Sequence, residues 1–397
     1  MNSKKQKPEL QFKKLGYMET LLTFVILGGI TTALYLYTSG YRLNKNEEGT
    51  IDMEKTGMIG VKSIPDGASV YLDGKLATAT DGTISGVKPD IHTIRVVKKG
   101  FLEWSKEIEV FEQLVTDITA VLVSQSTRLE PLTNTEAKYP TISPSLTKIA
   151  YFSFDTEKPG IWVLPLTGVN LGLFKTNPTI AIEDTKYTTY SSGEEIIWSP
   201  DENNLLVKSS NDVYYLIDLT TNSAQTTLKS EETLAEWKED MREKREDFVN
   251  NSVFVVPEHI VELALSEEVL WAPDEKKFLY KKEEGNQIQY WVYNFEVPIP
   301  VGEKTESLVF TTDKESPQPN ISWYTDSFHL ILVEGDIENE KNGTVSLIRI
   351  DGTNKTEVYN NTLYSDIAFS SPGGDKIIIV TSFKSGEQTD LYTVSIR

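Results

Sequence analysis

Residues 196–207 read IIWSPDENNLLV, and residues 269–280 read VLWAPDEKKFLY. In both stretches a tryptophan precedes a turn that contains Pro-Asp, and an apolar run follows. Proline presets φ at one turn position, and Ser and Asp side chains can bond the turn backbone. The phrase therefore predicts a tight turn between two strands, with Trp198 and Trp271 as core anchors between neighbouring sheets.

The same pattern recurs along the C-terminal two thirds of the chain. Its turns begin at Ser143, Ser199, Ala272, Tyr324 and Ser371, which gives spacings of 56, 73, 52 and 47 residues. A repeat of roughly 40–50 residues is typical of propeller blades. Apolar runs such as KIIIV at 376–380 indicate strands that are buried on both faces. We expect a β-propeller over residues 124–397, with five repeats visible and a sixth blade left open at 164–195 or 125–138.

The 73-residue spacing requires an insertion. Residues 230–249 read SEETLAEWKEDMREKREDFV and predict a helix, for which Ser230 is the expected N-cap. An apolar stripe recurs along it at helical spacing: Leu234, Trp237, Met241 and Phe248. Because such stripes usually face a core, we expect the helix to pack on the propeller, and a partner-binding helix is the alternative.

The five phrases resemble those of the TolB-like propeller family, whose blades carry Ser-Pro-Asp-Gly followed by two apolar strands. The resemblance covers residues 139–397. The final glycine of the family phrase is missing from every clean copy, and only Gly373-Gly374 retains it.

An uncharged run of 22 residues extends from Thr20 to Tyr41. As a helix it is about 33 Å long, enough to cross a hydrocarbon core of about 30 Å. Five lysines precede it, so the positive-inside rule places residues 1–19 in the cytoplasm and residues 42–397 outside. We expect an uncleaved transmembrane helix at 20–41; a cleaved signal peptide, which has a shorter apolar stretch, is the alternative.

The polar residues 42–57 predict a linker, and a β-rich segment follows at 58–123. Within it, Asp73-Gly74 separates two short apolar runs and is a strong hairpin signal, because both turn positions need a positive φ.

This segment resembles the PEGA domain family. PDGA at 65–68 stands at the family's signature, and VYLDG at 70–74 and Gly100-Phe101 follow in the expected order. There are two departures: Asp66 replaces the usual Glu, and Ile91 replaces a usual Gly. The resemblance implies a small β-sandwich of surface-exposed bacterial and archaeal proteins, with an adhesive or spacer role and no catalytic residues.

Composition excludes several classes of chemistry. The formal net charge is −20, although the first 45 residues are basic, and a body this acidic repels the phosphate backbone of nucleic acids. There is no cysteine, so disulfides, thiolate nucleophiles and cysteine metal sites are excluded.

No catalytic, cofactor-binding or metal-binding residues are recognisable in the sequence. His92, His259 and His329 lack metal-ligand spacing, and we expect them to be structural or exposed. The chain carries no G-x-S-x-G, Walker A, G-x-G-x-x-G, H-E-x-x-H or EF-hand motif.

These observations favour a membrane-anchored binding or scaffold protein of a prokaryotic cell envelope, which binds another envelope protein or a cell-wall glycan. The alternative is a glycan lyase or hydrolase built on the propeller. That enzyme requires a cluster of Asp, Glu, Arg and Tyr on one propeller face. Recognition is expected in the parts that do not repeat, namely the loops between blades and the 230–249 helix.

Overall fold

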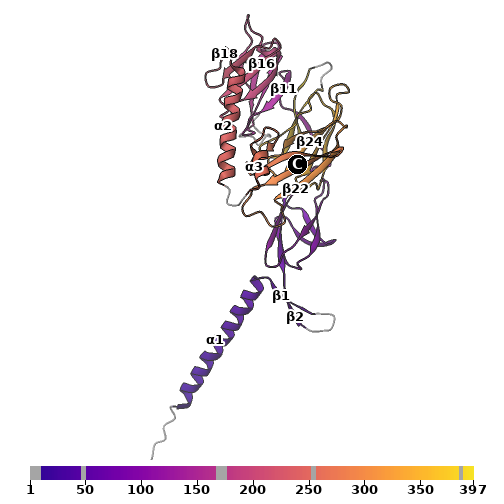
Figure 1. Cartoon of the computed structure of the whole chain (residues 1–397). Coiled ribbons are helices and arrows are strands. Elements are labelled where there is room, and N and C mark those ends of the chain that lie inside the picture. Colours follow the sequence, from indigo (N-terminus) through magenta and orange to yellow (C-terminus); the bar gives the residue numbers. More distant parts are fainter. Residues whose placement is uncertain (1–9, 46–50, 167–176, 252–255, 384–387) are drawn as a thin grey trace, which may run out of the picture. The chain divides into compact units, whose positions relative to one another are not determined.

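The computed structural model describes residues 10–45, 51–166, 177–251, 256–383 and 388–397 (Figure 1). Contacts divide the chain into two units. The smaller unit is Met1–Val96 with Glu107–Ala120, and the larger is Val97–Lys106 with Val121–Arg397.

Helix α1 (Leu10–Thr38) contains the expected apolar run up to Thr38, three residues short of the predicted end at Tyr41. Its window Glu19–Thr38 has a mean hydropathy of 1.7, is not buried, and is long enough to cross a membrane; a signal sequence shares these properties. The helix ends before Tyr41 because Gly40 adopts a φ of +85°, which breaks the helical path. The basic residues at 1–9 lie outside the described residues.

Residues 42–57 hold strands where the sequence predicts an irregular linker. Strands β1 (Tyr41–Lys45) and β2 (Ile51–Lys55) form an antiparallel pair. Beside it, the Thr56 N–H and hydroxyl both donate to the Gly40 carbonyl, at 2.9 and 2.6 Å. Polar composition did not prevent this pairing, because the backbone makes the ladder bonds.

Two small sheets form the β-rich segment, with strand orders β6-β3-β9 and β5-β4-β7-β8. Leu72 pairs with Lys75 across Asp73 (φ 48°) and Gly74 (φ 79°), which confirms the predicted hairpin. The strands are β3 (Gly57–Ile64), β4 (Ser69–Leu72), β5 (Lys75–Ala79), β6 (Gly82–Val87), β7 (Ile91–Val97), β8 (Trp104–Glu109) and β9 (Val115–Val121).

Five four-stranded antiparallel sheets make up most of the larger unit, and each predicted turn joins the first two strands of one sheet. Sheet 1 contains β11 (Ala137–Ile142), β12 (Lys148–Ser153), β13 (Gly160–Pro165) and β14 (Thr179–Glu183). Sheet 2 contains β15 (Gly193–Trp198), preceded by the 3-10 turn η1 (Tyr190–Ser192), then β16 (Asn204–Ser209), β17 (Tyr214–Asp218) and β18 (Ser223–Thr227). Sheet 3 contains β19 (Leu270–Trp271), β20 (Lys277–Glu284), β21 (Gln287–Asn294) and β22 (Glu306–Asp313).

Sheet 4 contains β23 (Asn320–Trp323), β24 (His329–Glu334), β25 (Asn342–Arg349) and β26 (Thr356–Thr362). Sheet 5 contains β27 (Phe369–Ser370), β28 (Lys376–Thr381), β29 (Asp390–Ser395) and, as its fourth strand, β10 (Leu129–Pro131). The two stretches left open for a sixth blade therefore contribute strands to sheets 5 and 1.

Apolar clusters join neighbouring sheets. Buried side chains from the middle strands pack sheet 1 on sheet 2, sheet 3 on sheet 4, sheet 4 on sheet 5, and sheet 5 on sheet 1. In the first of these clusters, for example, Ile161 of sheet 1 lies with Val207 of sheet 2. The central strands of sheets 1, 4 and 5 consequently have apolar residues on both faces, as the unbroken apolar runs predict.

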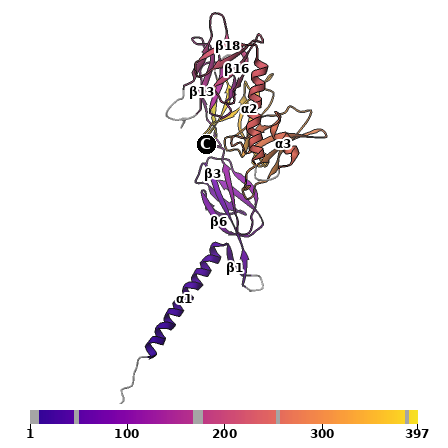
Figure 2. The same cartoon turned by 60° about the vertical axis from the view of Figure 1, so that its left-hand side comes forward.

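Helices α2 (Ser230–Asn250) and α3 (Glu258–Leu265) occupy the remaining face of sheet 3. Val249 of α2 and Ile260 of α3 are buried with Phe278 and Tyr293 of that sheet. Of the predicted stripe, Phe248 contacts the Trp271 and Phe295 rings, so the expected packing is confirmed at the C-terminal end of α2. Figures 1 and 2 both show α2 running alongside sheet 2.

Two details of the insertion differ from expectation. Ser230 is the first helical residue and not the cap, and no side-chain hydrogen bond caps the N-terminus of the helix. The apolar stripe is only half-buried, and Phe248 keeps 37% of its surface exposed.

The turn tryptophans join sheets through their indole N–H groups. Trp198 donates to the Thr141 carbonyl of sheet 1 at 3.3 Å, and Trp323 donates to the Leu270 carbonyl of sheet 3 at 2.8 Å. Thr141 and Leu270 occupy equivalent positions, two residues before their turns. The prediction that Trp198 is an anchor between sheets is confirmed.

Trp271 shows what the insertion changes. By the same rule its indole would reach the carbonyl of Ile197 in sheet 2, but it donates to Ala264 of α3 at 3.2 Å. Trp271 is half-buried and stacks on Phe295. The prediction is therefore wrong for this tryptophan, which ties sheet 3 to a helix.

Four of the five turns lack the family's glycine but keep the same backbone geometry. The fourth turn residue has a φ between 56° and 60° in every sheet: Leu146, Glu202, Glu275, Ser327 and Gly374. Two of these side chains bond the turn of the preceding sheet: the Ser145 N–H donates to Glu202 (2.6 Å), and the Asp274 N–H donates to Ser327 (3.1 Å). A glycine could not make these bonds.

A buried ion network ties residues 97–106 to the rest of the larger unit. Lys106 Nζ lies 2.7 Å from Asp351 Oδ2, and Arg349 pairs with both Asp351 and Glu303. Burial acts to raise the pKa of Asp351, but Arg349 and Lys106 outweigh it and lower the pKa. The network lies at the end of the sheets that carries the turns, since Arg349 is the last residue of β25 and Asp351 lies two residues beyond it.

Replacement of Trp323 by Phe leaves the Leu270 carbonyl without its indole donor, in a part-buried contact between sheets 3 and 4. We expect Trp323→Phe to lower the free energy of unfolding by about 1–2 kcal/mol, seen as a lower melting temperature by calorimetry. Trp291→Phe is the control, because the Trp291 indole bonds Gln289 and water can replace it. An equal loss in both variants would show that ring size, and not the junction bond, is the cause.

Candidate functional site

A cavity of about 1000 Å³ lies at the end of the sheets opposite the turns. Its walls come from β11 and β15, from residues 317–320, from the loop between β24 and β25, and from the loop between β26 and β27. β11 begins at the cavity, near Lys138, and ends at its turn, which starts at Ser143. The cavity therefore lies at the end of sheet 1 that is opposite the turn. It is built by the first strands of sheets 1 and 2, by segments between sheets and by one loop within sheet 4.

One wall centres on Tyr139. The pairing of β11 with β12 shifts register between Lys138 and Thr141, and Tyr139 has a φ of 47°. A non-glycine residue in this region costs roughly 1–2 kcal/mol, and such strain gathers at functional sites. The Tyr139 side chain is 61% exposed and lines the cavity, and its ring packs edge to face with Phe152.

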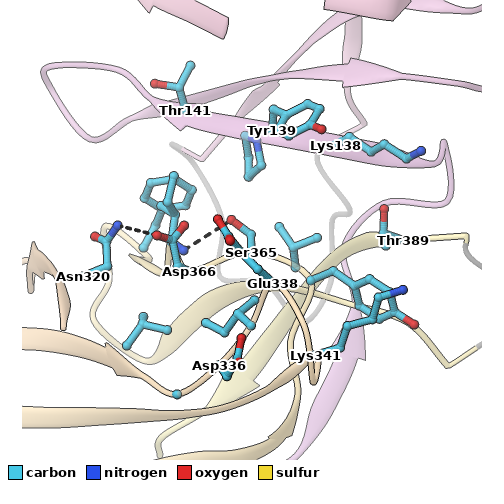
Figure 3. Close-up of a pocket in the computed structure, with 18 of the residues that line it drawn as sticks. Lys138, Tyr139, Thr141, Asn320, Asp336, Glu338, Lys341, Ser365, Asp366 and Thr389 are labelled. Carbon is cyan, nitrogen blue, oxygen red and sulfur yellow. Dashed lines mark hydrogen bonds between the residues drawn. The ribbon is translucent and has the colours of Figure 1, made fainter. Parts of the chain in front are cut away.

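The facing wall is polar. Figure 3 shows Asn320, Asp366, Ser365 and Glu338 across the cavity from Tyr139. Asn320 Nδ2 donates to Asp366 Oδ2 at 3.1 Å, which fixes that carboxylate.

Asp336 lies on the same loop as Glu338. It accepts the Asn339 N–H at 3.0 Å and also the Asn339 side-chain amide. These bonds lower the pKa of Asp336, so it is charged at neutral pH.

Acidic groups dominate the lining. Its carboxylates are Glu194, Glu195, Asp336, Glu338 and Asp366, against two basic side chains. Lys138 lies over the Phe154 ring at 4.5 Å, and Lys341 lies over the Tyr364 ring at 4.9 Å. Both ammonium groups are thus held on rings, and the open part of the cavity is negatively charged.

The cavity presents carboxylates, amides and an exposed aromatic ring. No histidine lines it, and the described residues contain no cluster of three groups able to hold a metal ion.

The structure does not bring the three histidines together. His259 is exposed on α3, and His329 is buried on β24 with Nδ1 2.7 Å from Asp326 Oδ2. His92 lies in the smaller unit, where Nδ1 is 2.7 Å from Asp73 Oδ2 and Nε2 is 2.8 Å from the Lys88 carbonyl.

Sequence reasoning named none of the cavity residues. The sequence carries only an indirect indication of the site, namely the expectation that the binding residues lie in segments that do not repeat. The bulge at Tyr139 and the loops at 335–341 and 364–367 are such segments.

The family profile of the PEGA domain matches residues 56–126, which confirms the resemblance seen in the sequence. No curated protein matches the chain.

Solved structures of TolB are among those that the chain resembles. TolB from Acinetobacter baumannii is 16% identical with a TM-score of 0.26, over 77% of this chain and 60% of that one. A putative TolB from Agrobacterium tumefaciens is 14% identical with a TM-score of 0.25, over 66% of this chain and 79% of that one. An oligogalacturonate lyase from Vibrio parahaemolyticus is 8% identical with a TM-score of 0.31, over 87% of this chain and 99% of that one.

His92 provides a test of electrostatics in the smaller unit. Both ring nitrogens face acceptors, so only the protonated ring can donate to both. Burial acts to lower the pKa of His92, but the bonds to Asp73 and Lys88 outweigh it and raise the pKa. The pair therefore stabilises the fold most below the unfolded pKa of about 6.5, and this contribution is lost as pH rises through the folded pKa.

We expect the His92 proton resonance, assigned with His92→Gln, to titrate above 6.5 by NMR. In Asp73→Asn the carboxylate is gone while burial remains, so the midpoint should fall. A midpoint unchanged by Asp73→Asn would contradict the assignment of the shift to this pair.

Proposed function

We propose that the chain is a single-pass membrane-anchored binding and scaffold protein of a prokaryotic cell envelope. In this proposal residues 1–19 are cytoplasmic, residues 20–41 span the membrane, and residues 42–397 lie outside. The apolar window Glu19–Thr38, the lysines before it and the PEGA match at 56–126 support the proposal.

We further propose that the five sheets are blades of one closed ring. The support is that four of its junctions are apolar contacts between sheets, and that β10 pairs with β29 to join the two ends of the unit. Helices α2 and α3 fill the fifth junction in this arrangement, between sheets 2 and 3.

The cavity at Tyr139 is the proposed binding site, and this is the observation that carries the function. Ligand sites are concave, with an apolar surface and a few polar groups that fix orientation. A strained aromatic residue that faces carboxylates and amides fits that description. The proposed ligand is another envelope protein or a cell-wall glycan.

A glycan lyase or hydrolase remains the second candidate, because five carboxylates and two tyrosines converge on the cavity. The lining lacks the arginine that this reading expected, and Asp336, with its lowered pKa, is a poor general acid. Incubation with purified cell-wall polysaccharides, followed by chromatography of the products, tests for this activity. Chain cleavage that Asp366→Asn abolishes would establish the enzyme.

The absence of native cysteine makes the topology easy to measure. We expect Asn211→Cys to react with a membrane-impermeant maleimide in intact cells, and Ser3→Cys to react only after permeabilisation. Because the anchor is proposed to be uncleaved, both variants should retain the full-length mass. Loss of the N-terminal label from the mature protein would instead show a cleaved signal peptide.

Capture from solubilised envelopes tests the binding site. We expect full-length protein to retain a specific ligand and Tyr139→Gly to lose it, since glycine removes the ring but suits the backbone at φ 47°. Tyr187→Gly removes a ring that is 90% exposed and lies outside the cavity, so it should bind normally. Equal retention by all three proteins would refute the cavity as the site.

A further inference from the structure

We propose that the cavity takes an extended polypeptide segment that bears lysine or arginine side chains. This inference rests on the proposed function, in which the cavity is the binding site, and it names the class of partner. It depends on the charges of the lining, on Tyr139 and on the partly open edge of β11.

The lining selects for positive charge. Five residues with carboxylates line the space, of which Glu194 pairs with Lys208, while the ammonium groups of Lys138 and Lys341 lie over rings. Glu195 and Glu338 are exposed and have no ion-pair partner within the described part of the chain. Salt screens charges beyond about 8–10 Å, so these local groups, and not the net charge of the whole chain, decide what enters.

Tyr139 strengthens the same preference. The face of an aromatic ring attracts ammonium and guanidinium groups. Figure 3 places this ring opposite Asp366 and Glu338, so a cation between them meets carboxylates on one side and the ring on the other. An anionic uronate chain would meet repulsion from the same carboxylates.

The placement of the carboxylates favours a peptide over an amino sugar. They lie on three separate elements: β15, the loop at 335–341 and the loop at 364–367. Lysine and arginine carry their charges on long stems spaced along a chain, so several can reach separate carboxylates together.

The backbone of β11 supports this choice. β11 is an edge strand of sheet 1, and its bulge breaks the ladder to β12 between Lys138 and Thr141. The edge is open only in part, because Pro140 has no N–H and the Thr141 carbonyl accepts the Trp198 indole N–H. An extended peptide can pair with a free strand edge through its main chain, whereas a glycan cannot form a ladder.

The test uses full-length protein in detergent and a fluorescein-labelled dodecapeptide of alternating lysine and serine, measured by anisotropy at physiological salt. We expect it to bind, and a glutamate-serine peptide of equal length not to bind. Glu195→Gln/Glu338→Gln/Asp366→Asn should weaken binding about tenfold.

The matched control is Glu236→Gln/Asp240→Asn/Glu243→Gln, which removes three exposed charges from α2 and should weaken binding less than twofold. Equal weakening by both triple variants would overturn the inference, because the attraction would then be non-specific. Binding of a chitosan hexamer in place of the peptide would also overturn it in favour of an amino sugar.

Envelope capture separates this inference from the proposed function. If Tyr139→Gly abolishes capture while the cavity triple variant captures normally, the cavity binds a ligand that is not cationic, and only the inference fails. If neither variant changes capture, the proposed function fails as well.

Discussion

A four-stranded sheet with apolar side chains on both faces cannot exclude water from either face alone, and this constraint governs the larger unit. Each sheet needs a partner on both sides, and four junctions meet the need with another sheet. Sheet 3 meets it on one side with α2 and α3. The indole hydrogen bonds join the same elements as the apolar contacts. Trp198 and Trp323 each donate to a carbonyl of the preceding sheet, whereas Trp271 donates to a carbonyl of α3.

The sequence predicted what depends on local pattern. The turns at Ser199 and Ala272, the hairpin at Asp73-Gly74 and the helix at 230–249 all follow from residue type and spacing, and the structure contains each of them. Trp271 was misassigned because its partner, Ala264, belongs to an insertion whose second helix the sequence reading did not include. The pair β1–β2 was not predicted, because a polar segment without apolar alternation carries no sequence signal for backbone pairing.

The cavity could not be predicted, because its residues are far apart in the sequence and share no motif. Lys138 and Tyr139 precede the first turn, while Asp336 and Asp366 lie about two hundred residues later. The strain at Tyr139 is equally hidden, since tyrosine gives no sign that its φ is positive. The turn residues predict the sheets from the sequence, whereas the cavity formed by the loops is apparent only in the folded structure.

The pairing of β10 with β29 makes the order of synthesis matter. Leu129 pairs with Val394, so β10 is made 265 residues before its partner strand. Contacts of such sequence separation form slowly. Until β29 is made, sheet 5 lacks the strand that links β10 to β28, so β10 remains unpaired while the sheets between them form.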